Sequence, residues 1–520
     1  MKKLSLFILS LIVSICSYAQ EKGELNIDEE INQKFKPVTD FLGSIVFVSF
    51  DFQFGEGANA VAFSIPFIVI WLFAGALFFT VYFRFINFRR FGLAIDIVRG
   101  KYDSIGNHGE VSHFQALTAA LSGTVGLGNI AGVAIAISLG GPGATFWIIL
   151  VGLLGMSTKF IECTLGVKYR KVDTDGTVRG GPMYYLRQGF EDLKMTINGQ
   201  EKNYGKIGKA LAFLFAILCI GGSFGGGNMF QINQAYKQFA NQYLEKGDWL
   251  IDNGWFFGLI VAILVGVVII GGIKSIAKVT DKIVPFMCGI YVLAALVVLG
   301  YHFEDIPSAI KIIFSGAFTP EAGYGGFVGV LIIGIQRAVF SNEAGVGSAS
   351  IAHSAVKTDD PVSEGIVALL EPFIDTVIVC TMTALVIIIT GEYQNYSGGG
   401  TEVGVSLTSA AFASVISWFP HVLTLAVMLF AFSTMISWSY YGLQAWSYLF
   451  GNSKKAAYIY KAIFCFFIII GAPLSLGAVT DFSDMMILAM CFPNIIGLIL
   501  LTPVVKNELN NYLMKIKRSE

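Results

Sequence analysis

The chain alternates between long apolar runs and short polar segments. Eleven runs are long enough for a membrane-spanning helix, which needs about 20 apolar residues. In order, they lie near 60–83, 114–137, 143–166, 210–236, 255–273, 283–301, 326–352, 365–390, 420–449, 457–477 and 481–504. The pattern predicts an all-α membrane protein with about 11 transmembrane helices.

Two of these runs are interrupted near their middle by small and polar residues. The first interruption lies within 121–132 and the second within 340–348. Backbone polar groups cannot be exposed to lipid cheaply, so irregular backbone at membrane depth normally lines a protected cavity. A matched pair of glycine-broken segments is typical of the midplane binding site of a secondary transporter.

The positions of the two broken runs indicate an internal repeat. If 60–83 is set aside as an extra helix, the other ten runs form two groups of five, at 114–301 and 326–504. Each group begins with a broken run. Because five is odd, the second group must enter the membrane upside down, which predicts a five-plus-five inverted repeat.

Lysine and arginine are distributed unevenly over the loops. With the first run pointing inward, the inner loops and the tail 505–520 hold 24 of the chain's 35 Lys and Arg residues. The outer loops beyond the first run hold only Lys237, Lys246 and Lys311. Since cytoplasmic loops are enriched in positive charge, we expect the N-terminus outside and a cytoplasmic C-terminal tail.

The N-terminus has the features of a secretory leader. A basic start, a short apolar core and small residues before position 20 predict a signal peptide over 1–19, although an uncleaved anchor remains an alternative. Residues 20–58 then form a periplasmic segment. The expected location is the cytoplasmic (inner) membrane, with multiple passes.

Composition narrows the class of protein further. The chain is 55% hydrophobic and 14% charged with net charge −1, and it has no basic stripe for nucleic acid. Six cysteines beyond the leader lie in apolar runs, as buried small hydrophobes do. His353 and His421 lack a catalytic partner pattern, so an enzyme is disfavoured. A channel is the other alternative, but two broken helices in one chain favour a transporter.

The first broken run carries candidate binding chemistry. Its glycines let the backbone leave helical geometry, which frees carbonyl oxygens for a small cation and N–H groups for a carboxylate. Thr124 and Asn129 add side-chain oxygens. The alternative is helix packing, since Gly128 and Gly132 have the GxxxG spacing.

Ionisable residues inside apolar runs are costly and therefore functional candidates. Arg337 and Glu343 flank the second break, and Glu343 could either tie the helix in place or handle a cation or proton. Two further pairs share a helix face: Glu371 with Asp375, and Lys159 with Glu162, which we interpret as a local ion pair.

Two unbroken runs add polar groups at mid-depth. The ninth run contains the adjacent hydroxyls of Ser433 and Thr434, which could bind sodium or bond back to their own helix. The fourth run carries Asn228 and Gln231 after three glycines. These amides could bind a substrate or hold helices together.

Several of these stretches resemble the alanine or glycine:cation symporter family, also called sodium:alanine symporters. The matching motifs are Gly140 to Trp147 with Gly152 and Gly155, Thr124 to Gly132, Gly180 to Tyr185, Phe340 to Gly345, Glu371 to Thr376, and Phe432 to Trp438. The chain departs from the family signature at Ile148 and Ile149, where Met-Trp is usual. The resemblance covers roughly 60–505.

The resemblance implies sodium-driven uptake of a small neutral amino acid: alanine, glycine or, as a further candidate, serine. It implies a sodium site made by Ser122 and Val125 with Ser433 and Thr434. Together with the residues singled out above, it gives the candidate substrate-binding residues Thr124, Gly126, Gly128, Asn228, Gln231, Phe340, Ser341 and Gly345. We expect no catalytic residue and no obligate protein partner. The choice of substrate, and of sodium against proton, stays open.

Overall fold

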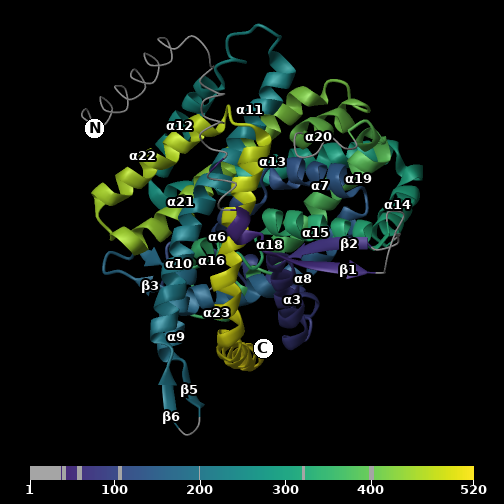
Figure 1. Ribbon diagram of the computed structural model, residues 1–520. Coiled ribbons are helices and arrows are strands. Elements are labelled where there is room, and N and C mark those ends of the chain that lie inside the picture. Colours follow the sequence, from purple (N-terminus) through teal and green to yellow (C-terminus); the bar gives the residue numbers. More distant parts are fainter. Residues whose placement is uncertain are drawn as a thin grey trace.

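Apolar helices make up most of the computed structural model shown in Figure 1. The structure describes residues 37, 43–54, 61–102, 108–197, 200–318, 323–396 and 403–519. The predicted signal peptide, most of the segment 20–58 and the predicted outer turn at Ser397 to Gly400 lie outside the described residues.

Six helical segments of the described chain are long and apolar enough to cross a membrane. They are α8 (Ala144–Lys168), Gly205–Tyr243 (α10, η3 and α11), α13 (Gly272–Tyr301), Pro361–Thr390 (α17, α18, η5 and α19), α21 (Phe419–Phe450) and Leu476–Arg518 in α23 (Leu476–Ser519). A bent pair, α6 with η2 and α7, raises the number to seven. The prediction of a mostly helical, multi-pass membrane protein is confirmed, while the count of eleven spans and the inverted repeat stay predictions.

The two predicted breaks are present. In the first, α6 (His113–Thr124) ends before η2 (Gly128–Gly132) and α7 (Val133–Gly140), and the two parts are bent by 50°. In the second, α15 (Gly323–Asn342) and α16 (Ala349–His353) are separated by non-helical backbone. Glu343, Gly345 and Gly347 there have φ of 55°, 91° and 88°. Two glycines at this break therefore adopt a conformation that other L-residues rarely take.

Shorter helices complete the bundle and connect the long ones. The shorter apolar ones are α3 (Phe67–Tyr82), α12 (Gly254–Ile269), α20 (Gly404–Ala413) and α22 (Lys454–Gly471). The connecting ones are α4 (Ile86–Arg89), α5 (Phe91–Val98), α9 (Pro182–Asp192), α14 (Ile306–Phe318), η4 (Phe303–Asp305) and η6 (Glu392–Gln394). The interrupted spans contain α10 (Gly205–Phe224), η3 (Gly225–Met229), α11 (Phe230–Tyr243), α17 (Pro361–Val367), α18 (Leu370–Pro372), η5 (Phe373–Cys380) and α19 (Thr381–Thr390).

Three antiparallel hairpins depart from the all-α prediction. They are β1 (Ser49–Phe54) with β2 (Val61–Pro66), β3 (Lys171–Val172) with β4 (Val178–Arg179), and β5 (Lys194–Ile197) with β6 (Gln200–Asn203). The first hairpin corrects the predicted helix at 60–83, because Val61 pairs with Phe54 and the helix starts only at Phe67. Pro66 explains the boundary, since the residue before a proline favours extended backbone.

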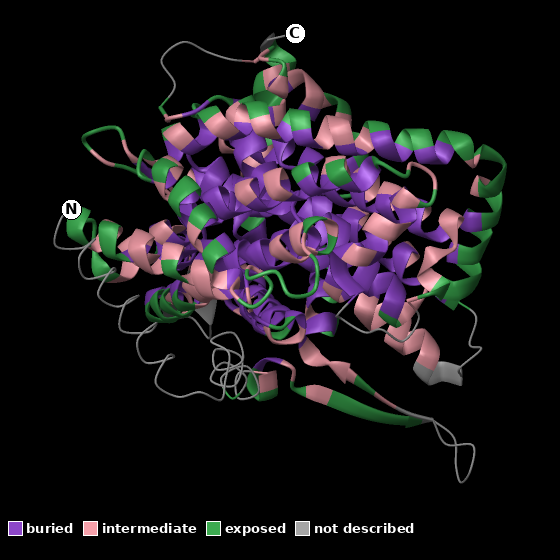
Figure 2. Cartoon of the chain, turned by 90° about the horizontal axis from the view of Figure 1, so that it is seen from above, coloured by how far each residue is buried: buried purple, intermediate pink, exposed green. Residues whose placement is uncertain are grey.

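Burial follows the pattern expected for a membrane protein. Figure 2 shows buried residues gathered in the middle of the bundle and exposed ones on its outer helices. Large apolar side chains such as Ile263, Val267 and Leu293 on α12 and α13 remain exposed. A surface of this kind is suited to lipid rather than to water.

The polar connections separate to opposite ends of the bundle. In Figure 1, α9, the β5–β6 hairpin and the C-terminus lie at one end, and the α11–α12 connection and α20 lie at the other. The first set was predicted to be cytoplasmic and the second external. Which end faces the cytoplasm stays a prediction from the distribution of positive charge.

We expect reporter fusions to separate the two ends. A reporter placed after Glu520 should be cytoplasmic, and one inserted between Gly398 and Gly399 should be periplasmic, because positive charge is retained inside. Alkaline phosphatase and green fluorescent protein fusions give opposite readouts for each position. Finding both positions on the same side would contradict the predicted orientation.

Candidate functional site

The backbone between α6 and η2 leaves the helix, and polar side chains take over its hydrogen bonds. The Gly126 N–H donates to Asn129 Oδ1 at 3.0 Å, and the Leu127 N–H donates to Gln231 Oε1 at 3.0 Å. Gln231 in turn donates to the Gly226 carbonyl at 2.8 Å. Buried backbone groups that lose their helical partners need such replacements. Gln231, a predicted substrate residue, thereby joins the fourth span to the first break.

Gly126 lies very close to the helix α21. A Cβ atom at this position would stand 2.5 Å from Thr434 Oγ1 and 3.1 Å from Gln231 Oε1. The Thr434 hydroxyl is buried and has no hydrogen-bond partner within the described part of the chain. Leaving a buried polar atom unpaired is costly. A hydroxyl that faces freed backbone at a break is a suitable ligand for a small cation.

The other three predicted sodium residues are Ser122, Val125 and Ser433. Ser122 Oγ donates to the Ser433 carbonyl at 2.7 Å, so the end of α6 and the middle of α21 are in direct contact. The Ser433 hydroxyl instead donates to Phe430 of its own helix at 3.0 Å. Val125, whose carbonyl is the fourth predicted ligand, is fully buried in the same turn. The structure therefore places the end of α6, which carries Ser122 and is followed by Val125, against the part of α21 that carries Ser433 and Thr434.

An aromatic side chain from the second broken helix faces the first break. The Phe340 ring approaches Gly128, where a Cβ atom would be 3.4 Å from it, and Gly226, where a Cβ atom would be 3.2 Å from it. Phe230 packs against it with ring centroids 5.0 Å apart. Gly128 of η2 and Gly226 of η3 thus make room for an aromatic wall beside the unwound backbone.

Asp375 on η5 links the two broken helices. Its Oδ1 accepts from Asn129 at 2.7 Å, and its Oδ2 accepts from Ser341 and Thr376, each at 2.7 Å. Ser341 was among the predicted substrate residues, but Asp375 was not. An acidic residue inside a predicted span was the available signal. Its partners come from different spans, and a single sequence does not give that contact.

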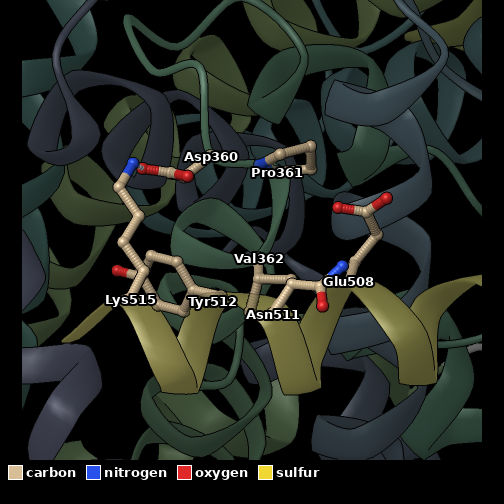
Figure 3. A pocket seen from close by; sticks show the side chains of 7 residues that line it. All are labelled: Asp360, Pro361, Val362, Glu508, Asn511, Tyr512 and Lys515. Atoms are coloured by element: carbon tan, nitrogen blue, oxygen red, sulfur yellow. Dashed lines mark hydrogen bonds and ion pairs between the residues drawn. The ribbon is translucent and has the colours of Figure 1, made fainter. Parts of the chain in front are cut away.

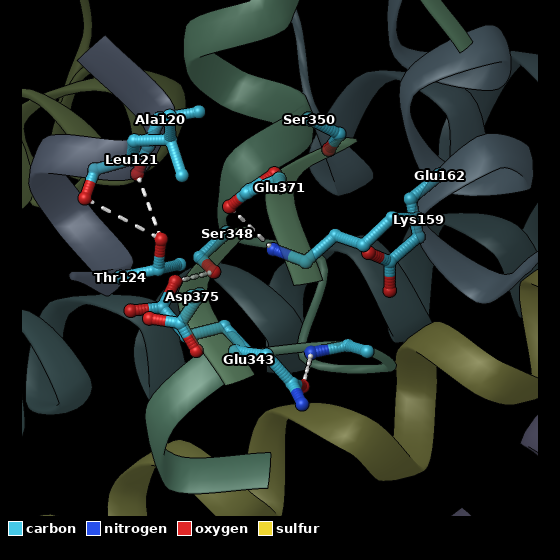
Figure 4. Close-up of polar contacts among 12 residues, drawn as sticks. Ala120, Leu121, Thr124, Lys159, Glu162, Glu343, Ser348, Ser350, Glu371 and Asp375 are labelled. Atoms are coloured by element: carbon cyan, nitrogen blue, oxygen red, sulfur yellow. Dashed lines mark hydrogen bonds and ion pairs between the residues drawn. The ribbon is translucent and has the colours of Figure 1, made fainter. Parts of the chain in front are cut away.

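Three of the predicted substrate residues make their contacts with other parts of the protein than the unwound backbone between α6 and η2. The Thr124 hydroxyl donates to the Ala120 carbonyl of its own helix at 3.3 Å, as Figure 4 shows. Asn228 donates to the Phe464 carbonyl on α22 at 2.8 Å. A Cβ atom at Gly345 would meet Leu72 and Ile495 rather than the unwound backbone of α6. Hydrogen bonding within and between helices accounts for the contacts of Thr124 and Asn228.

Arg337 and Glu343 have separate partners, since Arg337 lies within α15 and Glu343 is the first residue after it. Arg337 forms a buried ion pair with Asp484 of α23, and its guanidinium carbon lies 5.3 Å from the centre of the Phe340 ring. Glu343 accepts hydrogen bonds from Ser348 and, at 2.9 Å, from Trp438 Nε1. With both carboxylate oxygens bonded, the structure favours the tying role for Glu343 over cation handling.

The predicted local pair between Lys159 and Glu162 is wrong. Figure 4 shows Lys159 reaching Glu371 instead, at 3.0 Å, with both side chains fully buried. Glu162 accepts from Asn494 Nδ2 of α23 at 2.7 Å. Burial explains the difference, because each buried charge needs a well-directed partner and neighbouring helices supply one.

A surface pocket lies apart from the residues described above. Figure 3 shows it between α17 and the C-terminal part of α23, lined by Asp360, Pro361, Val362, Glu508, Asn511, Tyr512 and Lys515. Across this pocket, Lys515 Nζ forms an ion pair with Asp360 Oδ2 at 2.6 Å. It contains no predicted site residue, so it has no part in the candidate site.

Broken helices, buried polar side chains at both breaks and an apolar outer surface define a membrane transporter rather than an enzyme. The chain belongs to the sodium:alanine symporter family, whose model matches residues 52–520.

Relatives within this family cover most of the chain. The sodium/alanine symporter AgcS of Methanococcus maripaludis is 40% identical over 85% of this chain and 93% of its own length. A probable sodium/glutamine symporter, GlnT of Bacillus subtilis, is 32% identical over 86% of this chain and 87% of its own length. A solved structure, MhsT in complex with L-phenylalanine, is 16% identical and covers 78% of this chain and 100% of its own, with a TM-score of 0.49. The family match and the two relatives named for symport establish a cation-coupled amino-acid symporter.

Proposed function

We propose that the protein imports alanine or glycine together with sodium by alternating access. The observation that carries the proposal is the meeting of Gly126, Gln231 and the unpaired Thr434 hydroxyl at the break in the first broken helix. Non-helical backbone, a side-chain amide and a hydroxyl lie there close together. A cation and an amino acid are bound by groups of these kinds.

We propose that sodium binds between the turn at Ser122 to Val125 and the hydroxyls of Ser433 and Thr434. The Thr434 hydroxyl supports this placement because it is buried and otherwise lacks a partner among the described residues. The Ser122–Ser433 contact supports it as well, because it holds the two segments together. Sodium would then stabilise the arrangement of the two spans in which the amino-acid site is formed.

Close packing supports a small substrate. A Cβ atom would stand 2.5 Å from Thr434 Oγ1 at Gly126 and 2.3 Å from Ile487 Cδ1 at Gly226, and Phe340 forms a wall of the same region. Each additional methylene of a substrate must find room there, and overpacking costs about 1–3 kcal/mol. We therefore infer a preference for alanine, glycine and serine over leucine. Competition by unlabelled leucine and glutamine against labelled alanine uptake measures this preference, and glutamine is included because one relative is named for it.

The sodium site is tested by replacing its hydroxyls. We expect Thr434→Ala, alone or with Ser433→Ala, to raise the sodium concentration for half-maximal uptake about tenfold or more. The reason is the loss of a bond to a buried charge, worth about 1.5–3 kcal/mol. Labelled alanine uptake into proteoliposomes at a series of sodium concentrations measures the shift.

Ser439→Ala is the matched control for this experiment. Ser439 lies on the same helix, but its hydroxyl donates at 2.6 Å to the Ile436 carbonyl of that helix. The control should leave the sodium dependence unchanged. An unaltered sodium dependence in Thr434→Ala, with normal amounts of inserted protein, would reject the site.

A further inference from the structure

A buried network of charged side chains lies away from the candidate sodium and substrate residues. Lys159 pairs with Glu371 at 3.0 Å, and Glu371 Oε2 lies 3.5 Å from His353 Nε2. On its other side, His353 Nδ1 lies 2.5 Å from Glu364 Oε1, and the second oxygen of Glu364 meets His113. The side chains of Lys159, His353, Glu364 and Glu371 are 0% exposed. The transport proposal does not use this network.

His353 is held between two carboxylates, one at each ring nitrogen. A neutral imidazole has one N–H and one bare nitrogen with a lone pair. In either neutral tautomer, the bare nitrogen would face a carboxylate oxygen of Glu364 or Glu371, and two electron-rich atoms repel each other. Only the imidazolium presents an N–H to both carboxylates. It hydrogen-bonds Glu364 through Nδ1, while Nε2 faces Glu371 Oε2 at 3.5 Å, which is an ion-pair distance without a hydrogen bond. A carboxylate on each side of the ring therefore favours the protonated form.

The charge balance of the network gives the same answer. Among the side chains in direct contact, Glu364 and Glu371 contribute two negative charges and Lys159 contributes one positive charge, so neutral histidines would leave these contacts with a net charge of −1. Arg170, the next positive charge, is engaged with backbone carbonyls such as that of Ser354. An uncompensated charge in a dry interior is unfavourable. One imidazolium brings the sum to zero. Since His113 can donate its Nδ1–H to Glu364 as a neutral ring, one proton is enough.

We propose that His353 is a proton-binding site, at which one proton is held between Glu364 and Glu371. His353 ends α16, the short helix after the second break, whereas His113 begins α6, the first half of the first broken helix. Both contact Glu364 of α17. The bound proton thus links the second broken helix to α17, the same segment to which His113 links the first broken helix. This inference holds whatever amino acid or cation the protein carries.

Other titratable groups surround the site without contacting the ring. The groups whose charges act on Glu364 or Glu371 include Lys159, Glu162 and Cys163 of α8, Arg170 just after α8, Tyr441 of α21, and Glu343 in the second break. Glu343 and Glu162 are bonded to Trp438 and Asn494 respectively. The direct contacts of the His353 ring nitrogens are therefore the two carboxylates alone, among the described residues.

The proton is detected directly by solid-state nitrogen NMR of the full chain in lipid bilayers with ¹⁵N-histidine. The chain has five histidines. At pH 8.5, a histidine with the ordinary pKa near 6.5 is only about 1% protonated. We expect one ring to retain the imidazolium spectrum, in which both nitrogens carry hydrogen. That signal should vanish in His353→Gln and persist in His113→Gln.

The outcomes separate cleanly. The proposal is overturned if the unmodified protein shows only neutral rings at pH 8.5, or if the imidazolium signal survives His353→Gln. If His353→Gln fails to insert, the single Gln variants of the other four histidines show which ring carries the imidazolium signal. These are the variants of His108, His113, His302 and His421. A signal present in all four assigns the proton to His353, and its loss in any one of them overturns the assignment.

Discussion

Gly126→Ala should abolish or sharply reduce uptake, whereas Gly128→Ala should retain most of it. The two glycines lie two residues apart in the same break, but a Cβ atom at Gly126 would stand 2.5 Å from Thr434 Oγ1. At Gly128 the nearest atom, in Phe340, would be 3.4 Å away, which is ordinary contact. If the extra methyl group opposes substrate binding by the usual overpacking cost of about 1–3 kcal/mol, the affinity for the transported amino acid falls about 5- to 140-fold.

Initial rates of labelled alanine uptake over a range of sodium and alanine concentrations measure this difference. Gly128→Ala serves as the matched control, because it makes the same chemical change in the same segment. The amount of inserted protein should be similar for both variants. Equal activity of the two variants would contradict the close contact between the first break and Thr434.

Lys159→Met should strongly destabilise the protein. Lys159 and Glu371 form a fully buried ion pair, so the substitution leaves the Glu371 carboxylate without its lysine. Removing one partner of a buried pair typically costs about 3–5 kcal/mol. We expect a clear fall in the thermal unfolding midpoint of the detergent-solubilised protein and a lower yield of folded material.

The double variant Lys159→Met with Glu371→Gln is the control for charge. It removes both members of the pair, and the network then retains Glu364 with its histidine partners. We expect it to recover much of the stability that the single variant loses. A single variant as stable as the unmodified protein would show that the ion pair is dispensable. A double variant no better than the single one would assign the loss to packing instead of charge.

The sequence was informative where a local feature determines the structure. Glycines and polar residues in the middle of apolar runs placed both breaks correctly, because such residues cannot sit in a lipid-exposed helix without a reason. The adjacent hydroxyls of Ser433 and Thr434 and the glycine at 126 were also identified from the sequence. The structure places Thr434 against Gly126 and the Ser433 carbonyl against Ser122.

The remaining contacts depend on which helices become neighbours. Lys159 was assigned to Glu162 by its spacing along one helix, but its partner Glu371 comes from another span. Asp375 joins Asn129 and Ser341 across three spans, and no periodicity along the chain gives that contact. The strand β2 was read as part of a helix because its apolar composition suits both, and its pairing with β1 decided the outcome.

Sodium-coupled accumulation is the central claim, and reconstituted transport tests it most directly. Purified protein in proteoliposomes should accumulate labelled alanine or glycine above the external concentration when an inward sodium gradient is imposed without a proton gradient. Collapse of the sodium gradient should release the label. Accumulation driven by a proton gradient in the absence of sodium, or uptake that only equilibrates under a sodium gradient, would contradict the account.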